Sequence, residues 1–260
     1  MNVDKYLSRI RVEEPIYIDL YSLTMLQKAH LKAIPFENLD IHYGREISLE
    51  IGRLFEKIVV SERGGFCYEL NSLFHALLQK LGFMARIISA RVAKENGGFS
   101  PEYDHLAIVV SINGLNYLVD VGFGHFAIKP LLIRPGVRSS DGIGEFQIME
   151  FDRNYLEVSR VEDEVVIPEY MFSMVERKLT EFQNMCDYHQ KSADSHFTRK
   201  KVVSILTDDG RITLTNTQLK ISGLQGSQIE NFGEDEFEKY LERYFGIRIK
   251  RKPVEQGSTV

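Results

Sequence analysis

The chain has 260 residues, of which 43% are hydrophobic and 27% are charged, and this is the composition of an ordinary globular protein. A net charge of −5 argues against a nucleic-acid-binding surface, and no stretch approaches the roughly 20 apolar residues of a membrane helix. Two cysteines, Cys67 and Cys186, are too few for a disulfide framework, and the first ten residues contain no apolar signal core. We therefore expect a cytoplasmic protein with reduced thiols.

The first third of the chain predicts helices. Apolar residues recur at helical spacing from Leu20 to Ala33 and stop before Pro35. A clearer stripe follows, with Gly82 at the position of a C-cap glycine. The stripe consists of Leu70, Leu73, Phe74, Leu77, Leu78 and Leu81. This i, i+3, i+4, i+7 spacing predicts a helix with one buried face.

After Gly82 the apolar pattern takes the period of strands. Short β-branched segments predict strands at 85–92, 105–112, 115–121, 146–151, 155–158 and 161–167. We then expect a connecting helix within 174–188, a hairpin of 201–206 with 211–215 around Asp209-Gly210, and a last helix from Phe237 to Phe245 that ends at Gly246. Helices followed by strands and a mixed end indicate an α+β protein.

Cys67 is a candidate nucleophile because it lies in RGGFCYE, directly before the apolar stripe. A helix start carries partial positive charge and free N–H groups, which lower the pKa of a thiol. The preceding glycines allow a sharp turn and a close approach to a ligand. The alternative is that Cys67 is a small buried hydrophobic residue, and this is the interpretation that we prefer for Cys186.

A second inference concerns His105 and Asp120. Asn113-Gly114 is a two-residue hairpin signal, and if it closes a hairpin, Ile112 faces Leu115 and Asp120 faces Ala107. His105 then becomes the diagonal neighbour of Asp120 on the same face, with Cβ atoms about 7 Å apart. A carboxylate on this apolar face needs a partner. The pair is either a structural pair in a β core or the base and its orienting group for Cys67.

The remaining histidines that we considered give no functional signal. They are His30, His42, His75, His125 and His196, and none has a ligand spacing. There is also no Cys-x-x-Cys pair and no His-Glu-x-x-His motif. We therefore expect no metal site.

Several motifs together resemble one family. RGGFCYE with Cys67, DHLAIVV with His105 and YLVDVGFG with Asp120 look like the Cys–His–Asp triad of the arylamine N-acetyltransferases. IPFENLD (34–40) resembles the N-terminal signature of that family, and SADSHFTRKKVVSILTDDGRITL (192–214) resembles its later segment, with Ala193 in place of the usual proline. The resemblance runs in order from about residue 3 to residue 245.

The resemblance implies an α+β fold in three parts. These are an N-terminal helical bundle with the nucleophile (1–84), a central β-barrel with His105, Asp120 and a connecting helix (85–190), and a C-terminal α/β lid (191–260). The first two parts would resemble the core of papain-like proteases and transglutaminases. The resemblance also implies ping-pong transfer of an acetyl group to arylamines, arylhydrazines or arylhydroxylamines. Acetyl-coenzyme A would be the co-substrate, and no metal would take part.

Further site residues come only from the resemblance. Phe36, Phe123 and Phe197 would line the arene pocket, although ordinary core packing is the alternative for each. Gly122, Gly124, Tyr188 and Ser195 would border or contact coenzyme A. We interpret Arg63 and Glu69 as structural residues.

Two other functions fit the same residues. A transglutaminase-like or papain-like cysteine hydrolase would use this triad with water as the acceptor, but it has no need of the C-terminal third. A non-catalytic descendant would bind ligands only, and the intact triad argues against it. The natural acceptor amine, the acyl chain of the donor and the choice between monomer and homo-oligomer stay open.

Overall fold

In the computed structural model, which describes residues 1–224 and 226–249, the chain begins with helices. They are α1 (Val3–Arg9), α2 (Leu20–Ala33), α3 (Leu39–His42), α4 (Ile51–Phe55), the π-helical turn η1 (Glu56–Val60) and α5 (Cys67–Lys80). The helix predicted to stop before Pro35 is α2, whose first turn is capped because the Asp19 carboxylate accepts a hydrogen bond from the Ser22 N–H at 2.8 Å.

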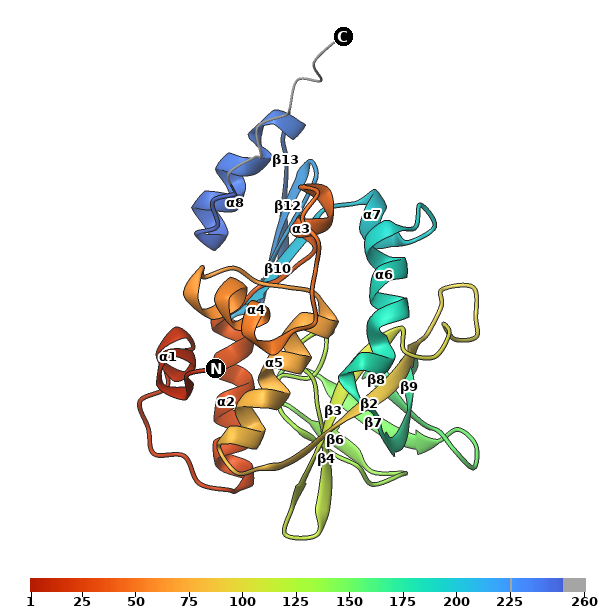
Figure 1. Cartoon of the computed structure of the whole chain (residues 1–260). Helices are drawn as coiled ribbons and strands as arrows, with labels where there is room; N and C mark the ends of the chain where they lie inside the picture. Colours follow the sequence, from red (N-terminus) through yellow and green to blue (C-terminus); the bar gives the residue numbers. More distant parts are fainter. Residues whose placement is uncertain (225, 250–260) are drawn as a thin grey trace.

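The predicted apolar stripe is the buried face of α5. Leu70, Leu73 and Leu77 are all fully buried, and they pack with strand residues such as Ile108 and Val110 in one core. Gly82 follows the helix with φ +93°, a conformation that favours glycine. The predicted helix and its end are therefore confirmed, and Figure 1 shows α5 lying along the sheet that contains β2 and β3.

Eight antiparallel strands form a nearly closed, barrel-like sheet in the order β5-β4-β3-β2-β9-β8-β7-β6. The strands are β2 (Met84–Val92), β3 (His105–Ile112), β4 (Leu115–Val119), β5 (Leu131–Leu132), β6 (Arg138–Ser140), β7 (Glu145–Glu150), β8 (Leu156–Glu162) and β9 (Val165–Glu176). The sheet encloses an aromatic core that includes Phe126, Phe146, Tyr170 and Phe172.

Two predicted elements have the wrong bounds, one strand of this sheet and the helix that follows it. The segment 161–167 is not one strand, because Asp163 and Glu164 form a turn with φ +47° and +64° between β8 and β9. Glutamate rarely adopts a positive φ, so the turn carries no clear sequence signal. The helix expected within 174–188 begins later, because β9 continues to Glu176 and is followed by the 3₁₀ turn η2 (Leu179–Phe182) and α6 (Gln183–Lys191).

A second, open sheet has the order β1-β10-β11-β12-β13. All of its strands except β1 follow the short helix α7 (His196–Arg199) in the chain. Its strands are β1 (Phe36–Glu37), β10 (Val202–Leu206), β11 (Gly210–Thr215), β12 (Gln218–Gly223) and β13 (Gly226–Asn231), and the 3₁₀ turn η3 (Glu234–Glu236) leads into α8 (Phe237–Phe245). The hairpin around Asp209-Gly210 is confirmed, since Leu206 pairs with Arg211. The sequence pattern did not predict β12 and β13.

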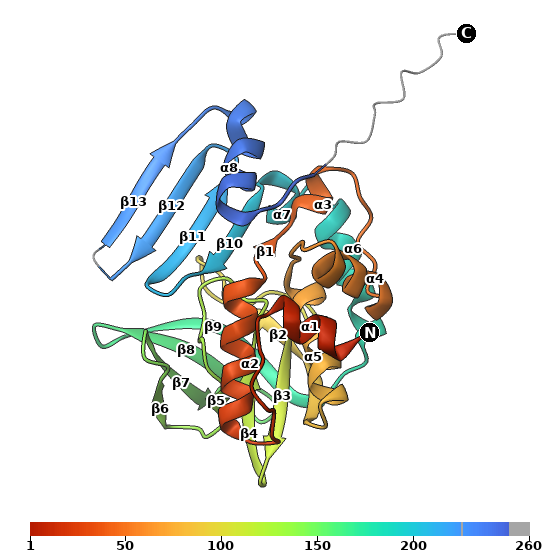
Figure 2. The same ribbon diagram turned by 90° about the vertical axis from the view of Figure 1, so that its left-hand side faces the viewer.

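The open sheet joins the two ends of the chain. Its edge strand β1 comes from the helical first third and pairs with β10, so Phe36 lies opposite Ser204 (Figure 2). The last helix ends at Gly246, as predicted, with φ +66°. The division into three domains stays a prediction, and part of its last segment (residues 225 and 250–260) lies outside the described residues. No helix within the described part of the chain is long and apolar enough to cross a membrane.

Candidate active site

Cys67 is the first residue of α5 and is only 4% exposed. It packs in a cluster with Phe66, Tyr68 and Leu106. Burial raises the pKa of the Cys67 thiol well above its usual value, and the carboxylates of Asp104 and Asp120 raise it further, whereas a backbone hydrogen bond from Leu106 lowers it.

The expectation that Cys67 has a lowered pKa is therefore wrong, because burial outweighs the effect of the helix start. A helix terminus stabilises a charge by about 0.3–1 kcal/mol at an exposed position and up to about 2 kcal/mol in a partly buried one. Removing a charge from water costs more than this unless the charge is paired. Cys67 therefore needs a base beside it to become a nucleophile.

His105 and Asp120 meet as the hairpin register predicts. Ile108 pairs with Val119 and Val109 pairs with Leu118, which is the register set by the Asn113-Gly114 turn. The His105 Nε2 atom lies 2.6 Å from the Asp120 Oδ2 atom, and both side chains are buried. Because Nε2 is engaged by the carboxylate, Nδ1 is the ring nitrogen that remains free to accept a proton from another group.

The Asp120 carboxylate accepts hydrogen bonds from four segments of the chain. Its Oδ1 atom accepts from the Asn71 Nδ2 atom and from the Gly122 N–H, both at 2.8 Å. Its Oδ2 atom accepts from the Tyr170 hydroxyl at 3.1 Å in addition to His105. The sequence did not predict the roles of Asn71 and Tyr170. Asn71 is detectable as a polar residue one turn after Cys67 on a buried helix, but Tyr170, on β9, gives no signal.

Gly122 and Gly124 differ although they border the same loop. A Cβ atom on Gly122 would lie 2.7 Å from the Cys67 Cα and 2.8 Å from the Asn71 Nδ2 atom, whereas a Cβ on Gly124 would meet nothing within 4 Å. Gly122 is thus the position where the loop rests on the start of α5. A larger residue at this position would collide with Cys67 and Asn71, so glycine is needed here for contact within the protein.

The three predicted pocket phenylalanines lie in two groups. The Phe123 ring lies with its centroid 5.0 Å from that of His105 and 5.2 Å from that of Tyr170. Phe36 and Phe197 lie 6.1 Å apart and belong to the cluster that contains Cys67. All three rings are only partly buried. Aromatic surfaces therefore lie on the Cys67 side and on the His105 side of the site.

Tyr188 and Ser195 lie in different environments. Tyr188 is 41% exposed, whereas Ser195 is 2% exposed. The Ser195 Oγ atom lies 3.1 Å from the His189 Nδ1 atom and accepts a hydrogen bond from the Phe197 N–H. The Ser195 hydroxyl is therefore engaged within the protein, and its contact with coenzyme A stays a prediction.

His189, which the sequence analysis missed, connects this segment to the site. Its Nε2 atom lies 3.0 Å from the Asp104 Oδ1 atom. Burial alone would raise the pKa of Asp104, but hydrogen bonds from His189 and Ser100 hold it below its usual value. Asp104 therefore keeps a negative charge next to His105 and close enough to raise the pKa of Cys67.

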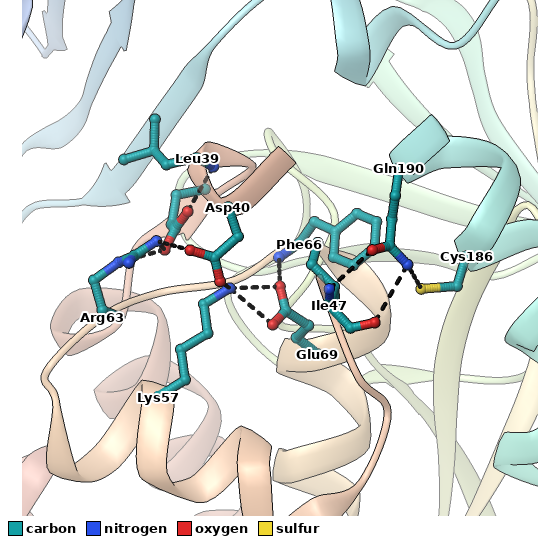
Figure 3. A network of polar contacts seen from close by, with 10 residues as sticks. Leu39, Asp40, Ile47, Lys57, Arg63, Phe66, Glu69, Cys186 and Gln190 are labelled. Atoms are coloured by element: carbon teal, nitrogen blue, oxygen red, sulfur yellow. Dashed lines mark hydrogen bonds and ion pairs between the residues drawn. The ribbon is translucent and has the colours of Figure 1, made fainter. Parts of the chain in front are cut away.

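A buried ionic network supports the turn that precedes Cys67 (Figure 3). The Glu69 carboxylate accepts a hydrogen bond from the Phe66 N–H at 3.2 Å and from Lys57 at 2.8 and 3.0 Å. Lys57 also pairs with Asp40 at 2.8 Å, and Arg63 pairs with Asp40 at 2.9 Å. This arrangement agrees with a structural role for Arg63 and Glu69.

The two glycines before Cys67 serve the same turn. A Cβ on Gly64 would lie 2.0 Å from the Pro35 carbonyl oxygen, and one on Gly65 would lie 2.8 Å from Glu69. Gly64 and Gly65 therefore allow a close approach to Pro35 and Glu69 of the protein itself, whereas the sequence led us to expect a close approach to a ligand. Cys186 lies beyond this network, where burial raises its pKa to about 12, in agreement with a structural role. Across residues 1–224 and 226–249, no group of three or more His, Cys, Asp or Glu residues could hold a metal ion.

A histidine that a carboxylate orients, and a buried cysteine whose helix start contacts the loop after that carboxylate, are the parts of a thiol enzyme. A family model described as N-acetyltransferase matches residues 19–254. Arylamine N-acetyltransferase, pineal gland isozyme NAT-10, of Gallus gallus is 31% identical over 98% of this chain and 97% of its own length. Arylamine N-acetyltransferase 1 of Homo sapiens is 29% identical over 98% and 97%.

Solved structures agree with these sequence matches. The arylamine N-acetyltransferase of Salmonella typhimurium superposes with a TM-score of 0.90 at 26% identity, over 99% of this chain and 94% of that one. The Mycobacterium smegmatis enzyme superposes with a TM-score of 0.89 at 27% identity, over 95% and 93%. The chain belongs to the arylamine N-acetyltransferase family.

The packing of Gly122 can be tested with a matched pair of variants. We expect Gly122→Ala to slow acylation of Cys67 roughly 100-fold, because a displacement of about 1 Å at a reacting group can cost that much. Gly52→Ala, at an exposed position of α4 where the new methyl group would meet nothing within 4 Å, should change the rate by less than about threefold. Stopped-flow measurement of the acylation step provides the comparison. Equal effects of the two substitutions would show that the contact with Cys67 is not decisive.

The ionic network predicts a pH-dependent loss of stability in Lys57→Met. Burial raises the pKa of Glu69 to about 7, and Lys57 is the group that lowers it most. Without Lys57, we expect the free energy of unfolding to fall by about 3–5 kcal/mol near pH 8. The loss should shrink as pH falls, because native Glu69 then binds a proton more readily than the unfolded chain does.

Chemical denaturation at pH 8 and pH 5.5 measures this difference in stability. Lys80→Met is the control, because Lys80 is exposed at the end of α5, the helix that carries Glu69. A loss of stability that is the same at both values of pH would exclude Glu69 as the group responsible.

The charge of Asp104 predicts a shift in the titration of Cys67. Because burial and then Asp104 raise the pKa of the Cys67 thiol, Asp104→Asn should move the inflection for alkylation of Cys67 by iodoacetamide to lower pH. Mass spectrometry of the Cys67 peptide follows the reaction, and the exposed Glu95→Gln variant controls for net charge. An unchanged or higher inflection in Asp104→Asn would contradict this electrostatic effect.

Proposed function

We propose that this protein transfers an acetyl group from acetyl-coenzyme A to the nitrogen of arylamines, arylhydrazines or arylhydroxylamines by a ping-pong mechanism through acetyl-Cys67. The observation that carries the proposal is the 2.6 Å contact of His105 Nε2 with Asp120 Oδ2, next to the Gly122 loop that rests on the helix start of the buried Cys67. Membership of the family, whose named relatives are arylamine N-acetyltransferases, supports the substrate class.

The first half-reaction begins when His105 Nδ1 accepts the proton of the Cys67 thiol. The thiolate attacks the carbonyl carbon of the thioester, the carbon–sulfur bond to coenzyme A breaks, and the departing sulfur takes the proton from His105. Because burial raises the pKa of Cys67, the thiolate forms only as the partner of the imidazolium. A thiolate of high pKa is also a strong nucleophile, so the same burial serves the attack.

The second half-reaction repeats these steps with an amine. The amine nitrogen attacks the acetyl carbonyl carbon, the bond to the Cys67 sulfur breaks, and the amine proton passes to His105 and then back to Cys67. Asp120 holds the imidazole in one orientation and stabilises its protonated form. Four hydrogen bonds to the carboxylate fix Asp120 itself.

The remaining assignments complete the proposal. Phe36, Phe123 and Phe197 line the acceptor pocket, which their partial exposure beside Cys67 and His105 supports. Tyr188, Ser195, Gly122 and Gly124 border coenzyme A. The helices and the barrel-like sheet correspond to the core of papain-like proteases and transglutaminases, and the enzyme works in the cytoplasm.

Intact-protein mass spectrometry after brief exposure to acetyl-coenzyme A, without an acceptor, tests the proposal. We expect the wild type to gain one acetyl group on Cys67 and to lose it within seconds when 4-methylaniline is added, with formation of the N-acetyl product. Cys67→Ala should gain nothing, although Cys186 remains in that variant as an internal control for nonspecific acetylation.

Two outcomes would contradict this function. Acetylation of Cys67→Ala to the level of the wild type would remove Cys67 as the acyl carrier. Rapid loss of the acetyl group in water, with no further acceleration by the amine, would instead identify a cysteine hydrolase.

A further inference from the structure

A cavity of about 800 Å³ lies between the barrel-like sheet and the open sheet, where Figure 2 shows β11 and β12 above β7 and β8. Phe126 and Phe146 form part of its wall on the barrel side. Phe126 contacts Phe123 with ring centroids 5.6 Å apart, and Phe123 in turn contacts His105. Two aromatic rings, those of Phe126 and Phe123, therefore lie between the cavity and the proposed catalytic histidine.

The open sheet turns its polar face toward this cavity. Arg211 pairs with Ser222 and Thr213 pairs with Lys220 across β11 and β12, and all four residues line the cavity. The alternate residues, including Leu214 and Leu219, are buried with α8 on the other face. The alternation of the two strands thus places two cations on the cavity side.

Arg211 is a partly buried cation without a carboxylate partner. Its NH1 group donates a hydrogen bond to the Ser204 Oγ atom at 3.1 Å, and within the described ranges 1–224 and 226–249 no carboxylate oxygen lies within 4 Å of it. Burial lowers its pKa to about 10, so it is still charged at neutral pH. A desolvated charge without a partner is costly, and the guanidinium has further N–H donors to offer.

Most other charged groups of the cavity are already engaged, and the remaining carboxylate, Asp209, is exposed and forms no ion pair with Arg211 among the described residues. Arg160 pairs with Glu162 and with Glu169. Asp141 accepts hydrogen bonds from three backbone N–H groups of the loops beside it. His125 adds no further positive charge near Arg211, because burial and then Arg160 and Arg211 lower its pKa. Arg211, with the exposed Lys220 beside it, therefore gives the cavity a positive wall.

We propose that this cavity binds an oxyanion of a reactant, a phosphate or a carboxylate, with Arg211 as its anchor and Lys220 as a second cation. The guanidinium can hold either group through two parallel hydrogen bonds. The inference rests on the proposed function for the identity of the reactants, since the acyl donor carries phosphates and an acidic aromatic amine carries a carboxylate. Arg211 acts in binding and takes no part in bond formation.

Binding to the Cys67→Ala protein tests the site without any acyl transfer. Isothermal titration calorimetry compares coenzyme A with pantetheine, which lacks phosphates, and 4-aminobenzoate with its methyl ester, which lacks the charge. We expect Arg211→Gln, made in this background, to weaken binding of one anion by roughly 10-fold or more, the usual effect of losing a charged hydrogen bond. Its uncharged counterpart should bind as before, and Arg211→Lys should restore part of the affinity.

The pattern of losses identifies the source of the oxyanion. A loss for coenzyme A alone assigns the site to the donor phosphates, and a loss for 4-aminobenzoate alone assigns it to the acceptor carboxylate. Arg153→Gln, at an exposed loop position, controls for the change in net charge, and thermal unfolding confirms that each variant is folded.

The proposal is overturned if Arg211→Gln leaves both anions bound as tightly as before, if an anion and its uncharged counterpart weaken equally, or if neither anion binds the parent protein. These outcomes are distinct from a failure of acetyl transfer. The acetylation of wild-type Cys67 by 4-nitrophenyl acetate, a donor without phosphates, reports on Cys67 whatever Arg211 binds.

Discussion

A buried carboxylate that must be satisfied determines the arrangement of this site. Asp120 follows the end of β4 in an interior of leucine, valine and phenylalanine, and an unpaired charge there would cost more than most single contacts provide. The structure compensates it with donors from α5, β3, β9 and the loop at Gly122. Each donor belongs to a segment that also carries or contacts the site, so satisfying the charge brings those segments together.

Cys67 shows how burial and local position oppose each other. The helix start and the hydrogen bond from Leu106 favour the thiolate, whereas burial and two carboxylates disfavour it. Burial has the larger effect, so the sulfur is kept protonated until a base accepts the proton. Asp104 adds a connection to the segment with α6 and α7, because the same carboxylate pairs with His189.

The molecule treats its buried cations in two ways. Lys57 and Arg63 are surrounded by the carboxylates of Glu37, Asp40 and Glu69, and this network fixes the turn before the nucleophile. Arg211 has only a hydroxyl partner within the described ranges, and it lines the large cavity between the two sheets. A paired cation stabilises the fold, whereas a cation without a carboxylate partner is available to a ligand.

The sequence by itself determined the features that depend on neighbours in the chain. The period of the leucines predicted α5, and the Asn113-Gly114 turn set the register that brings His105 beside Asp120. The boundaries of α2 and α8 followed from Pro35 and Gly246. In each case a repeat of 3.6 or 2 residues, or a residue with special backbone freedom, encodes the result locally.

Only the tertiary structure decided what depends on distant segments. Tyr170 reaches Asp120 across 50 residues, and His189 reaches Asp104 across 85. The strands β12 and β13 were missed because much of their surface is exposed, which leaves a weak apolar pattern. The raised pKa of Cys67 and the cavity beside Arg211 depend on the packing of several elements. Burial and long-range contact have no local signature, because they arise only when separate segments exclude water together.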